Sequence, residues 1–362
     1  MQFRFCYNLF INQKGGYIMS KTWKRILALL LSAVLALSLF TACGNGGANE
    51  TTTEPGPTEP AEEAKVLKVL TLGHSLATDT GHMLNLIFGA EGTGQYAQVV
   101  IATLYYSGCR LTQHVDFMSR NAPEYRLYLS SSATPDKPPV ITEGVTMLDA
   151  LRFDYWDIIV MQGGPWEIDA DSGFTDGNVQ KIQNYVNENK RNPLAIFAWH
   201  MPWALPADVD LLMMYPKEPN AHYQNYLAYD LSKPAYYEAM VGCVERHILT
   251  DETFQFVIPT GTTIQNAWSS YLEDKDLHRD YAHASDLGRV MTSYTWYCML
   301  MGIDHLEELK LDAVPKQFLK STEDKTQDRV LTEMEQLIIL ESVNNALAHP
   351  MEMTQSQYTE AP

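Results

Sequence analysis

Short apolar runs alternate with longer amphipathic segments along the middle of the chain. Runs with the length of a strand occur at five places: residues 66–72, 98–104, 156–162, 194–199 and 254–259. Helices are expected in the gaps between them: 76–89, 176–189, 234–249 and 285–300. Stretches such as Ile158-Ile159-Val160-Met161 are apolar at consecutive positions, which is typical of strands buried on both faces of a parallel sheet. The pattern predicts a three-layer α/β/α sandwich with a central, mostly parallel five-stranded sheet.

Two segments interrupt the alternation. Residues 125–142 contain Pro135-Asp136-Lys137-Pro138-Pro139 and predict a hairpin excursion before a short helix at 146–151. Residues 202–233 form a long aromatic and proline-rich insert, and a long loop inside a domain is more often functional than incidental. We divide the chain from Lys65 onward into three parts: the main domain at 65–305, a helical C-terminal extension at 306–349 and a frayed tail at 350–362.

The N-terminal region has the pattern of a bacterial lipoprotein signal. Lys21, Lys24 and Arg25 form a basic segment, Ile26–Leu39 is apolar, and Thr41-Ala42-Cys43 is a small-residue cleavage site that ends in cysteine. On this interpretation residues 19–42 are removed. Cys43 then carries lipid and anchors the protein to the extracellular face of the bacterial cell membrane. The alternative is a plain secretory signal with a coincidental cysteine.

Residues on either side of this signal are expected to lie outside the folded domain. The run Lys14-Gly15-Gly16-Tyr17 stands just before Met19 and can be encoded by codons that spell a ribosome-binding site. We therefore interpret residues 1–18 as an extension upstream of the true start. Residues 43–64 are rich in Thr, Pro, Glu and Gly, which predicts a flexible acidic tether between the lipid and the domain.

The charge balance excludes some classes of partner. The formal net charge is −18, and residues 1–42 hold five of the 26 basic residues and none of the 44 acidic ones. The remainder therefore carries 21 basic residues against 44 acidic ones, which argues against nucleic acid and favours a small or neutral substrate. The three cysteines after Cys43 have no short spacing and give poor support for disulfides or zinc. We expect no metal and no cofactor.

A serine and an Asp-x-x-His pair point to nucleophilic catalysis. Ser75 stands directly after the first apolar run, while Asp280 and His283 lie three residues apart on a short segment far downstream. In a catalytic triad His283 would take the serine proton, and Asp280 would orient the imidazole and stabilise its charged form. The alternative for Ser75 is a structural helix cap, because the following residues have a helical pattern.

In these motifs the chain resembles the SGNH (GDSL-type) hydrolase superfamily, and within it an uncharacterised branch described as a domain of unknown function. Four motifs stand in the family's order: Gly73-His74-Ser75, Gly108, Gln162-Gly163-Gly164 and Asp280–His283. Two of them depart from the usual pattern, because His74 replaces an Asp and the third motif lacks the usual Gly-x-Asn-Asp. The resemblance implies an SGNH/flavodoxin-like fold and a Ser-His-Asp triad that acts through an acyl-enzyme.

The resemblance also implies an oxyanion hole. Its donors would be the backbone N–H groups of Ser75 and Gly108 and, in place of the family's Asn, the side-chain amide of Gln162. The alternative for Gln162 is a polar residue that satisfies the loop after its strand. Five further residues are candidates for substrate binding, with packing as the plain alternative: His74, His114, Trp166, His200 and Trp203.

We therefore expect a surface-anchored serine hydrolase that cleaves an O-acyl ester of a small molecule or a glycan, for which acetylated carbohydrate is one candidate. The alternative is a lipoprotein that binds a ligand or glycan on the same fold without turnover. Hydrolysis and acyl transfer are not distinguished by the sequence.

Overall fold

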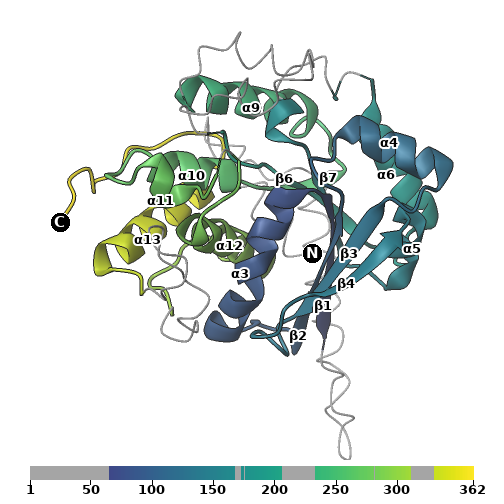
Figure 1. Ribbon diagram of the computed structural model, residues 1–362, viewed down its shortest axis with the longest axis horizontal. Helices are drawn as coiled ribbons and strands as arrows, with labels where there is room; N and C mark the ends of the chain where they lie inside the picture. Colours follow the sequence, from purple (N-terminus) through teal and green to yellow (C-terminus); the bar gives the residue numbers. More distant parts are fainter. Residues whose placement is uncertain (1–64, 168–172, 175, 206–232, 281, 311–329) are drawn as a thin grey trace, which may run out of the picture. The chain divides into compact units, whose positions relative to one another are not determined.

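A mixed β-sheet forms the centre of the fold (Figure 1). The computed structural model describes residues 65–362, except 168–172, 175, 206–232, 281 and 311–329. Within the described residues the sheet has seven strands in the order β4-β3-β2-β1-β5-β6-β7. Helices cover both faces, so the fold is the three-layer α/β/α sandwich that the sequence predicts.

Five parallel strands coincide with the five predicted runs. They are β1 (Val66–Gly73), β2 (Gln98–Tyr105), β5 (Ile158–Gln162), β6 (Ile196–His200) and β7 (Phe254–Ile258). All five residues of β5 are buried, as its uninterrupted apolar sequence requires. β1 lies at the middle of the sheet, between β2 and β5, and it leads directly to the candidate serine.

The prediction of five strands was wrong in number, because the hairpin at 125–142 extends the sheet. β3 (Tyr125–Ser131) pairs antiparallel with β2, and β4 (Val140–Val145) pairs antiparallel with β3. Tyr125 and Leu127 are buried on one side of β3. The hairpin satisfies the backbone groups of β2 that would otherwise form an open edge. The hairpin was predicted from the sequence, but its pairing with β2 was not.

The helices form two groups, one on each face of the sheet (Figure 1). α3 (Ser75–Glu91), α10 (Thr260–Ala267), α12 (Asp286–Met301) and α13 (Glu333–Ala348) pack together on one face, beside the short α11 (Asp274–Leu277). The apolar side chains of four other helices share one core cluster with the sheet: α4 (Leu111–Arg120), α5 (Met147–Phe153), α6 (Asn178–Asn189) and α9 (Lys233–His247). A 3₁₀ turn, η1 (Pro165–Glu167), follows β5.

The C-terminal segment is not frayed, in contrast to the expectation for residues 350–362. The Thr354 N–H donates to Asn266 Oδ1 at 2.8 Å, and the Ser356 N–H donates to Ser269 Oγ at 2.7 Å. The carbonyl of Tyr358 accepts from the Tyr271 N–H at 2.9 Å. Backbone groups that find partners in this way hold a segment in place even where few of its side chains are apolar. The segment thus lies along α10 and the turn that follows it.

Several expectations concern residues outside the described ranges. The upstream extension, the signal, Cys43 and the acidic tether all fall within residues 1–64, and most of the aromatic insert falls within 206–232. Residues 64–362 form one compact unit, which includes the C-terminal extension. In the described part of the chain, every helix is too short or too polar to cross a bilayer.

Candidate active site

The carboxyl ends of three adjacent parallel strands supply the centre of the site. β1 ends at Gly73, β5 at Gln162 and β6 at His200, and these strands are neighbours in the order β1-β5-β6. Ligands of open α/β sheets bind at this edge. The sheet therefore brings together His74, Ser75, Gln162 and His200 from segments that are far apart in the sequence.

Ser75 is the first residue of α3, and His74 is the residue that caps this helix. The His74 ring accepts the Leu76 N–H at Nδ1 over 3.4 Å, so the opposite nitrogen, Nε2, carries the hydrogen toward the Gly163 carbonyl at 3.4 Å. Burial lowers the pKa of His74 to about 3, so the ring is neutral at physiological pH. Ser75 is partly exposed at the positive end of the helix dipole, which favours developing negative charge.

Gly73 permits the close approach of β1 to β5. A Cβ atom at this position would lie 2.6 Å from Gln162 Oε1, which is shorter than any normal contact. The absence of that atom lets the Gln162 amide reach the backbone beside the serine, and Gln162 Oε1 accepts the His74 N–H at 3.1 Å. The glycine of the first motif is therefore required by packing against the third motif.

Asp280 and His283 form a closed unit on the turn before α12. His283 Nδ1 lies 2.9 Å from both carboxylate oxygens of Asp280. The same carboxylate accepts the backbone N–H of Ala282 at 2.9 Å and of His283 at 2.8 Å. Partial burial raises the pKa of Asp280, but the hydrogen bonds from the His283 ring and these two amides outweigh burial and hold it well below its usual range. Asp280 is thus a carboxylate that fixes Nδ1–H as a donor.

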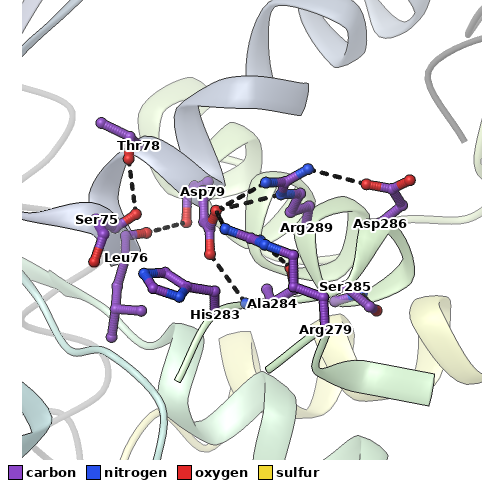
Figure 2. A network of polar contacts seen from close by, with 12 residues as sticks. Ser75, Leu76, Thr78, Asp79, Arg279, His283, Ala284, Ser285, Asp286 and Arg289 are labelled. Carbon is purple, nitrogen blue, oxygen red and sulfur yellow. Dashed lines mark hydrogen bonds and ion pairs between the residues drawn. The ribbon is translucent and has the colours of Figure 1, made fainter. Parts of the chain in front are cut away.

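His283 lies next to the helix that carries the serine. Figure 2 shows its imidazole beside the first turn of α3, where Ser75 and Leu76 lie. Because Nδ1 is engaged by Asp280, Nε2 is the ring nitrogen that can accept a proton. The His283 side chain is 22% exposed.

A directed chain of hydrogen bonds orients Gln162. The Thr260 hydroxyl donates to the Met201 carbonyl at 2.7 Å, so its oxygen accepts from His200 Nε2–H at 2.8 Å. His200 Nδ1 is then an acceptor, and it receives a hydrogen from Gln162 Nε2 at 2.8 Å. Burial lowers the pKa of His200 well below its ordinary value, which agrees with a neutral ring. The amide nitrogen of Gln162 keeps a second hydrogen, and its use toward an oxyanion stays a prediction.

Gly108 follows β2 on a turn. Its φ of +59° lies in the left-handed region that glycine adopts without strain. The turn is closed by the Cys109 N–H, which donates to the Tyr106 carbonyl at 3.2 Å. The predicted role of the Gly108 N–H as an oxyanion donor is compatible with its place at the carboxyl end of β2, beside β1.

The whole-chain comparisons assign the family. Residues 68–320 match the family described as a domain of unknown function (DUF4886). The chain belongs to this family. A DUF4886 family protein from Bacteroides uniformis ATCC 8492, solved by crystallography, superposes with a TM-score of 0.62 at 21% identity, over 82% of this chain and 100% of that one. At that identity the likeness shows the fold alone.

A second solved structure is more distant. It is a candidate SGNH hydrolase from Slackia heliotrinireducens, with a TM-score of 0.37 and 15% identity over 64% of this chain and 97% of that one. No curated protein matches the chain. The family is thus established for this DUF4886 domain, while its chemistry has to be argued from its own residues.

Glu167 is a residue of the site that the sequence reasoning missed. It is 2% exposed, and its two oxygens accept the Leu111 N–H at 2.7 Å and the Gly164 N–H at 2.9 Å. Burial raises its pKa to about 7, against the opposing effect of these two hydrogen bonds. Glu167 therefore joins the loop after Gly108 to the loop after Gln162. The available signal was a carboxylate placed three residues after Gly164.

Two of the remaining candidates, Trp203 and His114, are buried. Trp203 is 0% exposed, and its Nε1–H donates to the Ala282 carbonyl at 2.8 Å, so it supports the turn of Asp280 and His283 from within. His114 is buried, with Nδ1 2.8 Å from the Tyr125 hydroxyl, and burial lowers its pKa to about 4. The Trp166 side chain lies outside the described residues. Contacts of these side chains with a substrate stay predictions.

Two further observations bear on ligands. An apolar hollow beside the third motif is lined mainly by Gly163, Phe174, Trp199, Met201, Met240 and Cys243, and Ser75 is not among its lining residues. Among the described residues of the DUF4886 domain, no three His, Cys, Asp or Glu side chains are grouped so that they could hold a metal ion.

Proposed function

We propose that this DUF4886 domain is a serine hydrolase of the SGNH type, with Ser75, His283 and Asp280 as its triad. The observation that carries the proposal is the contact of His283 Nδ1 with both oxygens of Asp280 at 2.9 Å, on a turn beside the start of α3. A carboxylate held in this way fixes the tautomer of the imidazole and leaves Nε2 as the base. The DUF4886 fold and the order of the motifs support the same conclusion.

The proposed reaction proceeds in two steps. Ser75 Oγ attacks the ester carbonyl while His283 Nε2 takes its proton, and the negative charge develops on the former carbonyl oxygen. The N–H groups of Ser75, Gly108 and Gln162 would stabilise this oxyanion. The intermediate expels the alcohol, which receives the proton from His283. A water molecule, deprotonated by His283, then attacks the acyl-enzyme, and His283 returns that proton to Ser75 Oγ as the acid leaves.

The proposed substrate is an O-acyl ester of a small molecule or a glycan, with an acetyl group on carbohydrate as one candidate. The excess of acidic residues disfavours polyanionic substrates. We further propose that a lipid on Cys43 anchors the protein at the extracellular face of the bacterial membrane, with residues 43–64 as the tether. Both features suit a substrate on or outside the cell.

A second candidate is a ligand-binding or glycan-binding lipoprotein without turnover. It is favoured by the hydrogen bonds of Gln162. The side-chain oxygen of Gln162 accepts the His74 N–H, and its side-chain nitrogen donates to His200 Nδ1. These contacts give the amide a structural role that does not need catalysis. The two candidates differ in whether Ser75 is chemically activated.

Covalent labelling of the full chain distinguishes them. Intact mass after treatment with a fluorophosphonate should show one adduct on the parent and none on Ser75→Ala or His283→Ala. The alkylphosphonyl group transfers to Ser75 only if His283 removes its proton, so this pattern would support the hydrolase. A folded parent without an adduct would favour the binding protein.

A further inference from the structure

A buried carboxylate on the nucleophile's helix takes no part in the reaction proposed above. Asp79 is 3% exposed and stands four residues after Ser75, which is one turn further along α3. Burial of a charged carboxylate is costly unless it is paired and hydrogen-bonded. The partners of Asp79 therefore indicate what the residue contributes.

Two of these partners border the turn that carries His283, and the third lies in α12. Asp79 Oδ2 accepts the N–H of Ala284 at 3.0 Å, and Ala284 directly follows His283. Asp79 Oδ1 lies 2.9 Å from Arg279 Nη2, and Arg279 directly precedes Asp280. The same oxygen lies 3.1 Å from Nη2 of Arg289, in the first turns of α12. Figure 2 shows the three groups converging on this one carboxylate.

Hydrogen bonds between its own residues also close this turn. The Arg279 N–H donates to the His283 carbonyl at 3.0 Å, and the Arg279 guanidinium donates to the Ala284 carbonyl. Asp280 holds the amides and the ring of His283 inside this turn. Arg279 and Ala284, on either side of this turn, both contact Asp79 of α3, while the Trp203 Nε1–H donates to the Ala282 carbonyl within it.

We infer that Asp79 is a positioning residue that sets the distance between Ser75 and His283, an inference that rests on the proposed hydrolase function. Ser75 and Asp79 share one helix, and residues four apart on a helix are neighbours on its surface. Ser75 is therefore connected to the turn of His283 by one turn of helix and the Asp79 carboxylate. α3 and α12 also meet where the Ser293 hydroxyl donates to the Thr80 carbonyl at 2.6 Å, but that contact does not reach the turn of His283. Misplacement by about 1 Å can cost about a hundredfold in rate.

A matched control exists at the other end of the same helix. Glu91, the last residue of α3, has a side chain that is 6% exposed, against 4% for Asp79. Its Oε1 accepts the Tyr294 hydroxyl of α12 at 2.8 Å. Both acids therefore join α3 to the segment around α12, but only Asp79 is attached to the turn of His283. A purely structural role predicts similar effects for Asp79→Asn and Glu91→Gln.

The test compares these two variants with the parent, all as full chains. It measures the fluorophosphonate labelling rate, kcat and KM for 4-nitrophenyl acetate, and Tm. Asp79→Asn should lower kcat and the labelling rate by about ten- to a hundredfold with KM changed less than about threefold. Glu91→Gln should keep kcat within about twofold of the parent, even if its Tm falls as much as that of Asp79→Asn.

The remaining outcomes are separable. Equal kcat in Asp79→Asn and the parent, or an equal loss in Glu91→Gln, would overturn this inference and leave the hydrolase standing. A folded parent that neither labels nor turns over would overturn the proposed function and this inference with it. If Asp79→Asn does not fold, Arg279→Gln decides, because its side chain is 31% exposed. It should lower kcat by about three- to tenfold without a change in KM, and an unchanged kcat would refute the positioning role.

Discussion

At the scale of residues, the site depends on hydrogen bonds whose directions are fixed. The tautomers of His74 and His283 follow from a backbone N–H and a carboxylate, and that of His200 follows from the Thr260 hydroxyl, which donates to the Met201 carbonyl. The local Asp280–His283 pair could be predicted because an i, i+3 spacing is visible in the chain. Glu167 could not, because its partner Leu111 lies 56 residues away.

The first residue-scale prediction concerns Ser75. Ser75→Ala should remove esterase activity by about three orders of magnitude or more, since no nucleophile remains. Its effect on stability should stay within about 0.5 kcal/mol, because His74 caps α3 and alanine suits the first helical position. Activity assays and thermal unfolding check the two parts. A large fall in Tm would instead make Ser75 a structural cap.

The second residue-scale prediction concerns Gln162, which has a proposed catalytic role and a structural role. Gln162→Ala should lower kcat by about 10²–10³ if the amide is an oxyanion donor. It should also lower the free energy of unfolding by about 1–3 kcal/mol, since His200 Nδ1 loses its donor and the His74 N–H its acceptor. Urea unfolding and turnover should be measured on the same preparation. Unchanged kcat with reduced stability would leave Gln162 as a structural residue.

At the scale of elements, the apolar runs were sufficient to predict the five parallel strands and the edge at which the site lies. They were not sufficient for the sheet's width, because β3 carries only two fully buried apolar side chains, Tyr125 and Leu127, and its pairing with β2 is a long-range event. The C-terminal segment was likewise missed. Several of its contacts with α10 and the following turn are made by its backbone, and sequence patterns do not reveal backbone partners.

This segment makes an element-scale prediction. Removal of residues 350–362 should destabilise the domain by about 3 kcal/mol, because Asn266, Ser269 and the Tyr271 N–H lose their partners. Removal of 359–362 alone, which are exposed, should have no measurable effect. Denaturant midpoints of the two truncations give the comparison. Equal midpoints would show that the segment contributes nothing.

At the scale of the whole molecule, buried ionisable groups set the response to acid. Burial lowers the pKa of His74 to about 3 and of His114 to about 4 from 6.5, so below pH 6.5 the unfolded chain binds more protons at these sites. Their contribution to stability is present above pH 6.5 and is lost as the pH falls toward 4. Glu167 acts in the opposite sense: its raised pKa of about 7 gives stability at low pH that is lost as the pH rises from 4.5 through 7.

We predict that the free energy of unfolding falls as the pH drops below 6.5. The two buried histidines, His74 and His114, together lose more stability in this range than Glu167 gains. Each histidine contributes a slope of about 1.4 kcal/mol per pH unit inside its window. Urea titrations at several pH values between 4.5 and 7.5 should show it. Glutamine at position 114 cannot titrate. His114→Gln should therefore reduce the slope of the free energy of unfolding against pH by about 1.4 kcal/mol per pH unit, the contribution of one proton. A slope identical to that of the parent would show that His114 is not neutral in the folded state.

The attachment of the base to the nucleophile's helix also bears on folding. Asp79 and Ala284 are 205 residues apart, so we expect their contact to form late in folding, after α3 and α12 have come together. A partly folded chain has a serine but no base beside it. Under the proposed chemistry, reactivity toward a fluorophosphonate then counts completely folded molecules, and in refolding experiments it should return after the circular dichroism signal of the helices. Under that chemistry the protein would stay unreactive until these long-range contacts had formed.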